Sequence, residues 1–155
     1  MLGLIFGLAY VPHAAKVVFV HQKLARESKE KMGKTDDKTT IRAYDIRWPR
    51  LATLAAVDAS QEGRLISRLE ACHYNALENY PLAVAAVLGA LIAGVDVDQV
   101  ELHAAGYFCL RIVYTLIYAV NIKMNTAYTR SIVWAISLVL LFHLLSLAAS
   151  VKAKA

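Results

Sequence analysis

Residues 68–81 read Arg68-Leu69-Glu70-Ala71-Cys72-His73-Tyr74-Asn75-Ala76-Leu77-Glu78-Asn79-Tyr80-Pro81, and they continue without a break into the apolar run Leu82 to Val95. At about 100° per residue, Arg68, Asn75 and Glu78 fall within one arc of a helix. Polar side chains are costly inside a bilayer, so they normally face a bundle interior or a wet cavity and mark a functional site. The alternative is that these residues lie above the bilayer and only cap the bundle.

The composition is that of a polytopic membrane protein. Of the 155 residues 58% are hydrophobic, and the mean hydropathy of +0.46 is too high for a soluble domain of this length. Four stretches approach the roughly 20 residues that a helix needs to cross about 30 Å of hydrocarbon. They cover residues 2–20, 71–95, 102–123 and 131–151. We therefore predict one all-α domain over residues 1–155, an integral membrane four-helix bundle with one long polar loop, residues 21–68.

The net charge of +5 is concentrated in that loop. An excess of Lys and Arg in one connection between spans follows the positive-inside rule, so we predict that loop 21–68 is cytoplasmic. The same distribution removes most of the case for a nucleic-acid partner. The segment Val95 to Glu101 is predicted to be a short acidic turn on the opposite side.

Sequence spacing gives no sign of a disulfide or a metal site. Cys72 and Cys109 both lie in predicted spans, and for Cys72 a packing role is favoured over that of a site thiol. No spacing of His and Cys resembles a metal site, and no Gly-rich phosphate loop is found. We therefore expect no metal.

The first span and the loop contain further polar groups. Lys16 lies close to the end of the first span, so its ammonium is expected to extend to the headgroups. Residues 22–34 are predicted to continue the first span as a helix that ends at Gly33. The aromatic and basic segment Tyr44 to Arg50 suits either an anchor at the headgroups or a lid over a cavity.

The third predicted span carries Arg111, Tyr114 and Tyr118 at positions i, i+3 and i+7, which share one face of a helix. Tyr at the end of a span is often an interfacial residue, but a buried Arg needs an anionic partner or a wet cavity. Asn121 to Thr129 is predicted to be a polar connection. Ser131 would then cap the fourth span, near Arg130 at its positive end, with Trp134 as an interface anchor.

In this order, on four spans, the motifs resemble those of the MAPEG family, the membrane-associated proteins in eicosanoid and glutathione metabolism. The resemblance covers most of the chain. It depends on Asn75-x-x-Glu78 with Tyr80-Pro81, on Arg111-x-x-Tyr114-x-x-x-Tyr118, on Arg130-Ser131-x-x-Trp134, and on Val11-Pro12-His13 and Pro49-Arg50. The family resemblance implies a homotrimer in the lipid bilayer, with glutathione held between neighbouring subunits at the cytosolic end. It also suggests the endoplasmic reticulum.

Glutathione has two carboxylates, an ammonium and a thiol, so its site needs Arg side chains, an acid and amide or hydroxyl groups. The resemblance assigns the carboxylates to Arg68 and Arg111 and the ammonium to Glu78. The other polar atoms of glutathione are assigned to the following set: His73, Asn75, Tyr114 and Tyr118. By likeness to the catalytic arginine of the family, Arg130 would stabilise the thiolate, with Ser131 as a hydrogen-bond donor to it.

Two positions depart from the family pattern. Ala71 stands where many members have an Arg, so one contact to a carboxylate is either moved to Arg68 or missing. The spacing from Tyr118 to Arg130 is longer than usual, so Arg130 either reaches the thiol through a bulged connection or misses it.

Three functions remain open after this comparison. The first is a glutathione-dependent enzyme, a transferase or peroxidase that acts on a lipophilic electrophile. The second is a non-catalytic trimer that binds lipid or presents a partner, as the lipoxygenase-activating member of the family implies. The third uses the same cavity for an isomerisation or cyclisation of an apolar metabolite.

Overall fold

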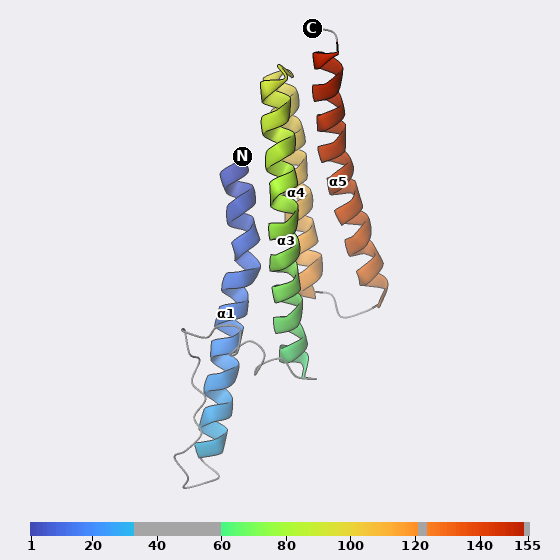
Figure 1. The fold of residues 1–155 in the computed structure, drawn as a ribbon. Coiled ribbons are helices and arrows are strands. Elements are labelled where there is room, and N and C mark those ends of the chain that lie inside the picture. Colours follow the sequence, from blue (N-terminus) through green and yellow to red (C-terminus); the bar gives the residue numbers. More distant parts are fainter. Residues whose placement is uncertain (33–59, 121–123, 154–155) are drawn as a thin grey trace. The chain divides into compact units, whose positions relative to one another are not determined.

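The computed structural model describes residues 1–32, 60–120 and 124–153. Four helices form in these ranges (Figure 1): α1 (Leu2–Met32), α3 (Gln61–Ile92), α4 (Val97–Val120) and α5 (Met124–Lys152). Each contains a segment that is long and apolar enough to cross a bilayer. The prediction of an all-α, four-helix membrane protein is confirmed.

The helices extend beyond the spans that were predicted from hydropathy. α1 continues to Met32, as the predicted helical extension requires, and α3 begins at Gln61, ten residues before the predicted second span. The predicted connection Asn121–Thr129 is wrong, because α5 already begins at Met124. The predicted acidic turn is also too long, since α4 begins at Val97. Hydropathy finds only the part of a helix that fits the hydrocarbon, whereas the backbone hydrogen bonds continue through charged residues beyond it.

The described chain forms two compact units, Met1–Tyr10 with Cys72–Ala155, and Val11–Ala71. The first of these, which we call the main unit, has a core of small side chains. Ala83, Ala86 and Ala90 of α3 are fully buried, together with Leu141 and Leu144 of α5. Small residues allow membrane helices to approach closely, and packing at short range is what holds such helices together. α4 and α5 pack directly on each other.

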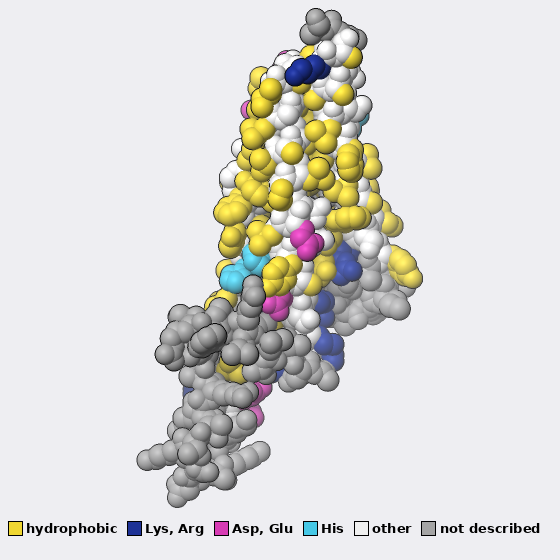
Figure 2. Space-filling model, in the orientation of Figure 1, with side chains coloured by type: hydrophobic (Ala, Val, Ile, Leu, Met, Phe, Trp, Pro, Cys, Tyr) yellow, Lys and Arg dark blue, Asp and Glu magenta, His cyan; other side chains and the backbone are white. Residues whose placement is uncertain are grey.

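The outer surface of the main unit is largely apolar. Large hydrophobic side chains such as Leu102, Leu116 and Val139 are exposed, and Ile92 is 81% exposed. Figure 2 shows hydrophobic side chains spread over the face that it draws. A surface of this kind needs lipid or another protein chain around it, because water would be an unfavourable neighbour.

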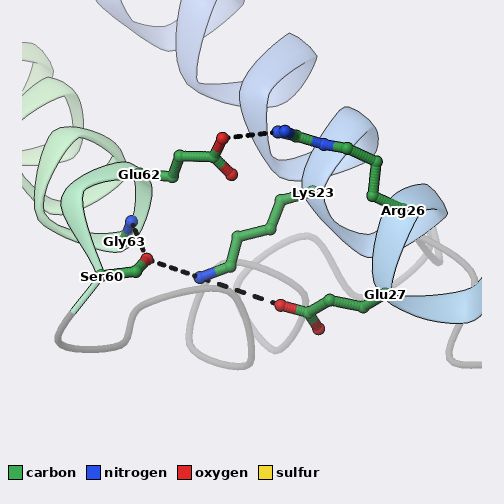
Figure 3. Close-up of polar contacts among 6 residues, drawn as sticks. All are labelled: Lys23, Arg26, Glu27, Ser60, Glu62 and Gly63. Carbon is green, nitrogen blue, oxygen red and sulfur yellow. Dashed lines mark hydrogen bonds and ion pairs between the residues drawn. The ribbon is translucent and has the colours of Figure 1, made fainter. Parts of the chain in front are cut away.

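The unit Val11–Ala71, which we call the minor unit, contains a polar network beside a small apolar cluster of Val20, Leu24 and Ile66. Ser60 caps α3, since the backbone N–H of Gly63 donates to its Oγ at 3.1 Å. Lys23 Nζ also donates to that Oγ at 3.3 Å, and Arg26 pairs with Glu62 at 2.7 Å (Figure 3).

The minor unit also contains a partly buried ion pair. Lys16 Nζ lies 3.2 Å from Glu70 Oε1, and the Lys16 side chain is only 8% exposed. The prediction that Lys16 extends to the headgroups is therefore wrong. A carboxylate on the neighbouring helix holds its charge instead, which removes the need to reach water. The segment Tyr44–Arg50 and the Pro49-Arg50 pair lie outside the described residues.

Candidate functional site

The buried face of α4 carries polar groups among apolar ones. Its buried residues recur at helical spacing: Val100, His103, Ala104, Tyr107, Arg111, Tyr114 and Tyr118. Arg111, Tyr114 and Tyr118 therefore share one face, as their spacing predicts. This face turns toward α3 and α5 rather than toward the surroundings, so the Arg is enclosed by protein.

Arg111 is 4% exposed and is only partly satisfied by its neighbours. Its Nη2 donates to Asn75 Oδ1 of α3 at 3.2 Å, and its Cζ lies 4.5 Å from the centroid of the Tyr114 ring. Asn79 Nδ2 in turn donates to the backbone carbonyl of Asn75 at 2.7 Å. Nη1 of Arg111 is buried and has no hydrogen-bond partner among the described residues. A buried donor on a cation is costly when it has no partner, so this position favours a hydrogen-bond acceptor beside Nη1.

A series of arginine side chains and tyrosine rings extends from Arg111 of α4 to Arg130 of α5. The rings of Tyr114 and Tyr118 lie 5.2 Å apart, and Cζ of Arg130 lies 4.4 Å from the centroid of the Tyr118 ring. Arg130 thus reaches the same series despite its longer spacing from Tyr118, because α5 begins early enough to carry it there as a helical residue. Two guanidinium groups, each stacked on a phenol ring, thus lie at the two ends of this pair of rings.

A contact between Cys72 and Thr115 connects α3 to the helix that carries Arg111, Tyr114 and Tyr118. Cys72 is buried and packs against Tyr114 and Tyr118. Its Sγ donates a weak hydrogen bond to Thr115 Oγ1 at 3.9 Å, and Thr115 Oγ1 donates to the carbonyl of Arg111 at 2.9 Å. Cys72 therefore has the packing role that was favoured for it. It lies beside the polar cluster, a name we use for the following residues: Asn75, Asn79, Arg111, Tyr114, Thr115, Tyr118 and Arg130.

Trp134 lies against this cluster, where the sequence suggested an interface anchor. The residue is partly buried and packs against Cys72, Tyr114 and Tyr118. Its Nε1 is buried and, within the described part of the chain, has no hydrogen-bond partner. Neither Trp134 nor Thr115 was predicted from the sequence to be a site residue. The first occurs in the Arg130-Ser131-x-x-Trp134 motif, and Thr115 lies one turn after Arg111, so both could have been found from helical spacing.

Four other predicted site residues lie outside the cluster. His73 Nδ1 donates to the carbonyl of Ala9 in α1 at 2.8 Å, so its ring faces α1. Glu78 and Ser131 are exposed. Ser131 lies seven residues inside α5, so the prediction that it caps this helix is wrong. Arg68 belongs to the minor unit, and its Nε is buried without a hydrogen-bond partner among the described residues.

The side chains of the cluster are of the types that can bind an anion. Arg111 and Arg130 carry positive charge, while Asn75, the neighbouring Trp134 and the phenols carry groups that can form hydrogen bonds. Guanidinium groups bind carboxylates through parallel N–H donors and favour the ionised form of a thiol. No group of three or more His, Cys, Asp or Glu side chains suited to a metal occurs in residues 1–32, 60–120 and 124–153.

A comparison with protein-family models matches the chain to the MAPEG family over residues 2–150. That family has a four-helix architecture and includes both glutathione-dependent enzymes and non-catalytic members. Comparisons with curated proteins and with solved structures gave no match. The match spans all four helices and includes every residue of the polar cluster, so this chain belongs to the MAPEG family.

Proposed function

We propose that this protein is a glutathione-dependent membrane enzyme, of the transferase or peroxidase type, that acts on a lipophilic electrophile. Two things support the proposal. The family includes enzymes of this kind, and the main unit gathers two guanidinium groups in the same cluster as amide, phenol and indole groups. Glutathione offers the carboxylates and the thiol that such a cluster is suited to bind.

The main support is Nη1 of Arg111, which is buried and has no hydrogen-bond partner in the part of the chain that the structure describes. Arg111 lies nine residues before the end of α4, which is about 14 Å along the helix axis. A guanidinium at that depth with an unused donor fits a site for an anion that enters from solution. In this proposal Arg111 binds a carboxylate of glutathione, and Asn75 holds the guanidinium in the orientation that the carboxylate needs.

Arg130 is the proposed catalytic residue. Its position over the Tyr118 ring orients the guanidinium without neutralising its charge. A free thiol has a pKa of about 8.5, and a guanidinium beside the sulfur lowers it, so more thiolate is present at neutral pH. Ser131, the next residue, is proposed to donate a hydrogen bond to the same sulfur. Attack of the thiolate on the electrophile then forms a new bond to sulfur, while the electron pair of the bond that breaks leaves with a departing group or stays on the acceptor and takes up a proton from water.

A homotrimer would complete the site. Glu78 and Ser131 are exposed in the single chain, and so is much of the apolar surface. We infer that a neighbouring subunit covers these positions and that Glu78 binds the ammonium of glutathione there, with Arg68, His73 and Tyr114 as further contacts. The apolar surface would admit an electrophile from the bilayer. We place the protein in the endoplasmic reticulum with a cytosol-facing site, by analogy with the family.

One observation favours a non-catalytic function instead. Only some of the predicted glutathione contacts meet in the main unit, because Glu78 and Ser131 are exposed and His73 faces α1. A trimer that binds lipid or presents a partner needs no complete thiol site. An isomerase or cyclase of an apolar metabolite would also bind its substrate without conjugating glutathione.

The variant Arg130→Ala separates these functions. We expect purified Arg130→Ala to lose at least about 90% of its conjugation of glutathione to a lipophilic acceptor, because the thiolate loses its neighbouring charge. Arg130→Lys should retain part of the activity, since it keeps a charge but not the planar group. Arg64→Ala, an exposed arginine in the first turns of α3, is the control. Unchanged conjugation by Arg130→Ala would show that the thiolate role is wrong.

A further inference from the structure

Two histidines meet far from the polar cluster, on the two helices that pack directly on each other. His103 Nε2 of α4 lies 2.8 Å from His143 Nδ1 of α5, and the ring centroids are 5.0 Å apart. His103 precedes Arg111 by eight residues, which is about 12 Å along α4. The pair is therefore separate from the residues proposed to bind glutathione.

The imidazole ring of His103 is buried and is held in a fixed orientation by the backbone. It is 7% exposed, and its Nδ1 donates to the backbone carbonyl of Gln99 at 2.7 Å. That bond places the proton on Nδ1, so the lone pair of Nε2 points toward His143. Metal-binding histidines usually have this arrangement, in which a carbonyl fixes the ring and its tautomer from behind.

His143 supplies a second nitrogen that can adjust. Its side chain is exposed, so its ring can turn without a change in the packing of the core. In a tetrahedral site with metal–nitrogen distances of about 2.0–2.1 Å, two nitrogens lie roughly 3.3 Å apart. The present separation of 2.8 Å thus has to open by only about half an ångström, which rotation of an exposed side chain provides.

We propose that His103 and His143 form a binding site for a divalent transition-metal ion, of the class of Zn²⁺, Ni²⁺ and Cu²⁺, to which imidazole is well suited. Within the described residues no third His, Cys, Asp or Glu completes a three-ligand set, so water or another molecule fills the remaining positions. On binding, the ion replaces the proton that lies between the two nitrogens. That proton moves to His143 Nε2 or to solvent, and no electron is transferred.

Such a site would link α4 to α5 through a metal ion in place of the present hydrogen bond between His103 and His143. The two ligands are 40 residues apart in sequence, which explains why their spacing shows no metal motif.

The test is a titration of tag-free protein in detergent with Zn²⁺, followed by calorimetry. The Cys109→Ser background removes an exposed thiol of α4 that would also bind the ion. We expect one Zn²⁺ per chain, and at least tenfold weaker binding in His143→Gln and in His103→Gln. His21→Gln, which changes an exposed histidine of α1, should bind as the background protein does.

A second readout covers the case in which His103→Gln does not fold. Zn²⁺ should raise the melting temperature of the background protein and not that of His143→Gln, because a ligand stabilises only the state that binds it. His143 is exposed, so this variant is expected to fold. An equal Zn²⁺ affinity in His143→Gln, or no binding by the background protein, would overturn the proposal and leave the pair as a hydrogen bond only.

Discussion

Arg111 combines burial with a hydrogen-bond donor for which the described residues offer no acceptor. Asn75 satisfies one of its terminal nitrogens and the Tyr114 ring covers one face of the group, yet Nη1 has no partner among the described residues. Desolvation of a cation is costly unless its donors are used. The surroundings of Arg111 therefore support the proposed anion site.

Replacement of Arg111 should weaken glutathione binding more than it changes the fold. We expect Arg111→Met to raise the Kd for glutathione at least tenfold, which corresponds to about 1.4 kcal/mol. Arg111→Lys should be intermediate, because one ammonium cannot replace a planar fork. Calorimetry on the purified protein measures the Kd, with Arg64→Met as the matched control. An unchanged Kd in Arg111→Met would remove this residue from the site.

The minor unit contains two ion pairs between α1 and α3 that differ in their exposure to solvent. Lys16 and Glu70 form an ion pair whose lysine is 8% exposed, while Arg26 and Glu62 form one whose side chains are 58% and 43% exposed. The two pairs have similar chemistry but different surroundings. Their contributions to stability should therefore differ, since water screens the exposed pair.

A double-mutant cycle measures that difference. We expect Lys16→Met alone to cost about 3 kcal/mol, because it leaves Glu70 without its partner, and Lys16→Met with Glu70→Leu to recover most of that loss. The same cycle with Arg26→Met and Glu62→Leu should give a coupling of about 0.5 kcal/mol or less. Unfolding followed by circular dichroism in one detergent provides the values. Equal coupling energies for the two pairs would contradict this explanation.

Across the whole molecule, sequence periodicity predicted some contacts and missed others for a physical reason. The shared face of Arg111, Tyr114 and Tyr118 follows from positions within one helix, so the helical repeat was sufficient. The contact of Arg130 with Tyr118 could be expected only from the family resemblance. The packing of Trp134 against Cys72, Tyr114 and Tyr118 was not predicted, because an aromatic residue near the end of a span suits both a membrane interface and a contact between helices.

Contacts between helices depend on the register of one helix against another, which a single sequence does not give. The pairs Lys16–Glu70 and His103–His143 are 54 and 40 residues apart, and neither was predicted. Helix ends were also missed, since α5 begins at Met124 and not near Ser131. Apolar composition was enough to predict four helices, but not the positions at which charged turns extend them.

The proposal for the whole protein requires that the cluster of Arg111 and Arg130 ionises a bound thiol. Detergent-purified protein should be titrated with glutathione at neutral pH while the ultraviolet absorbance of the thiolate is followed. We expect a saturable thiolate signal that is lost in Arg130→Ala and kept in Arg64→Ala. Absence of a thiolate signal at saturating glutathione would contradict the proposed enzyme and favour a non-catalytic member of the family.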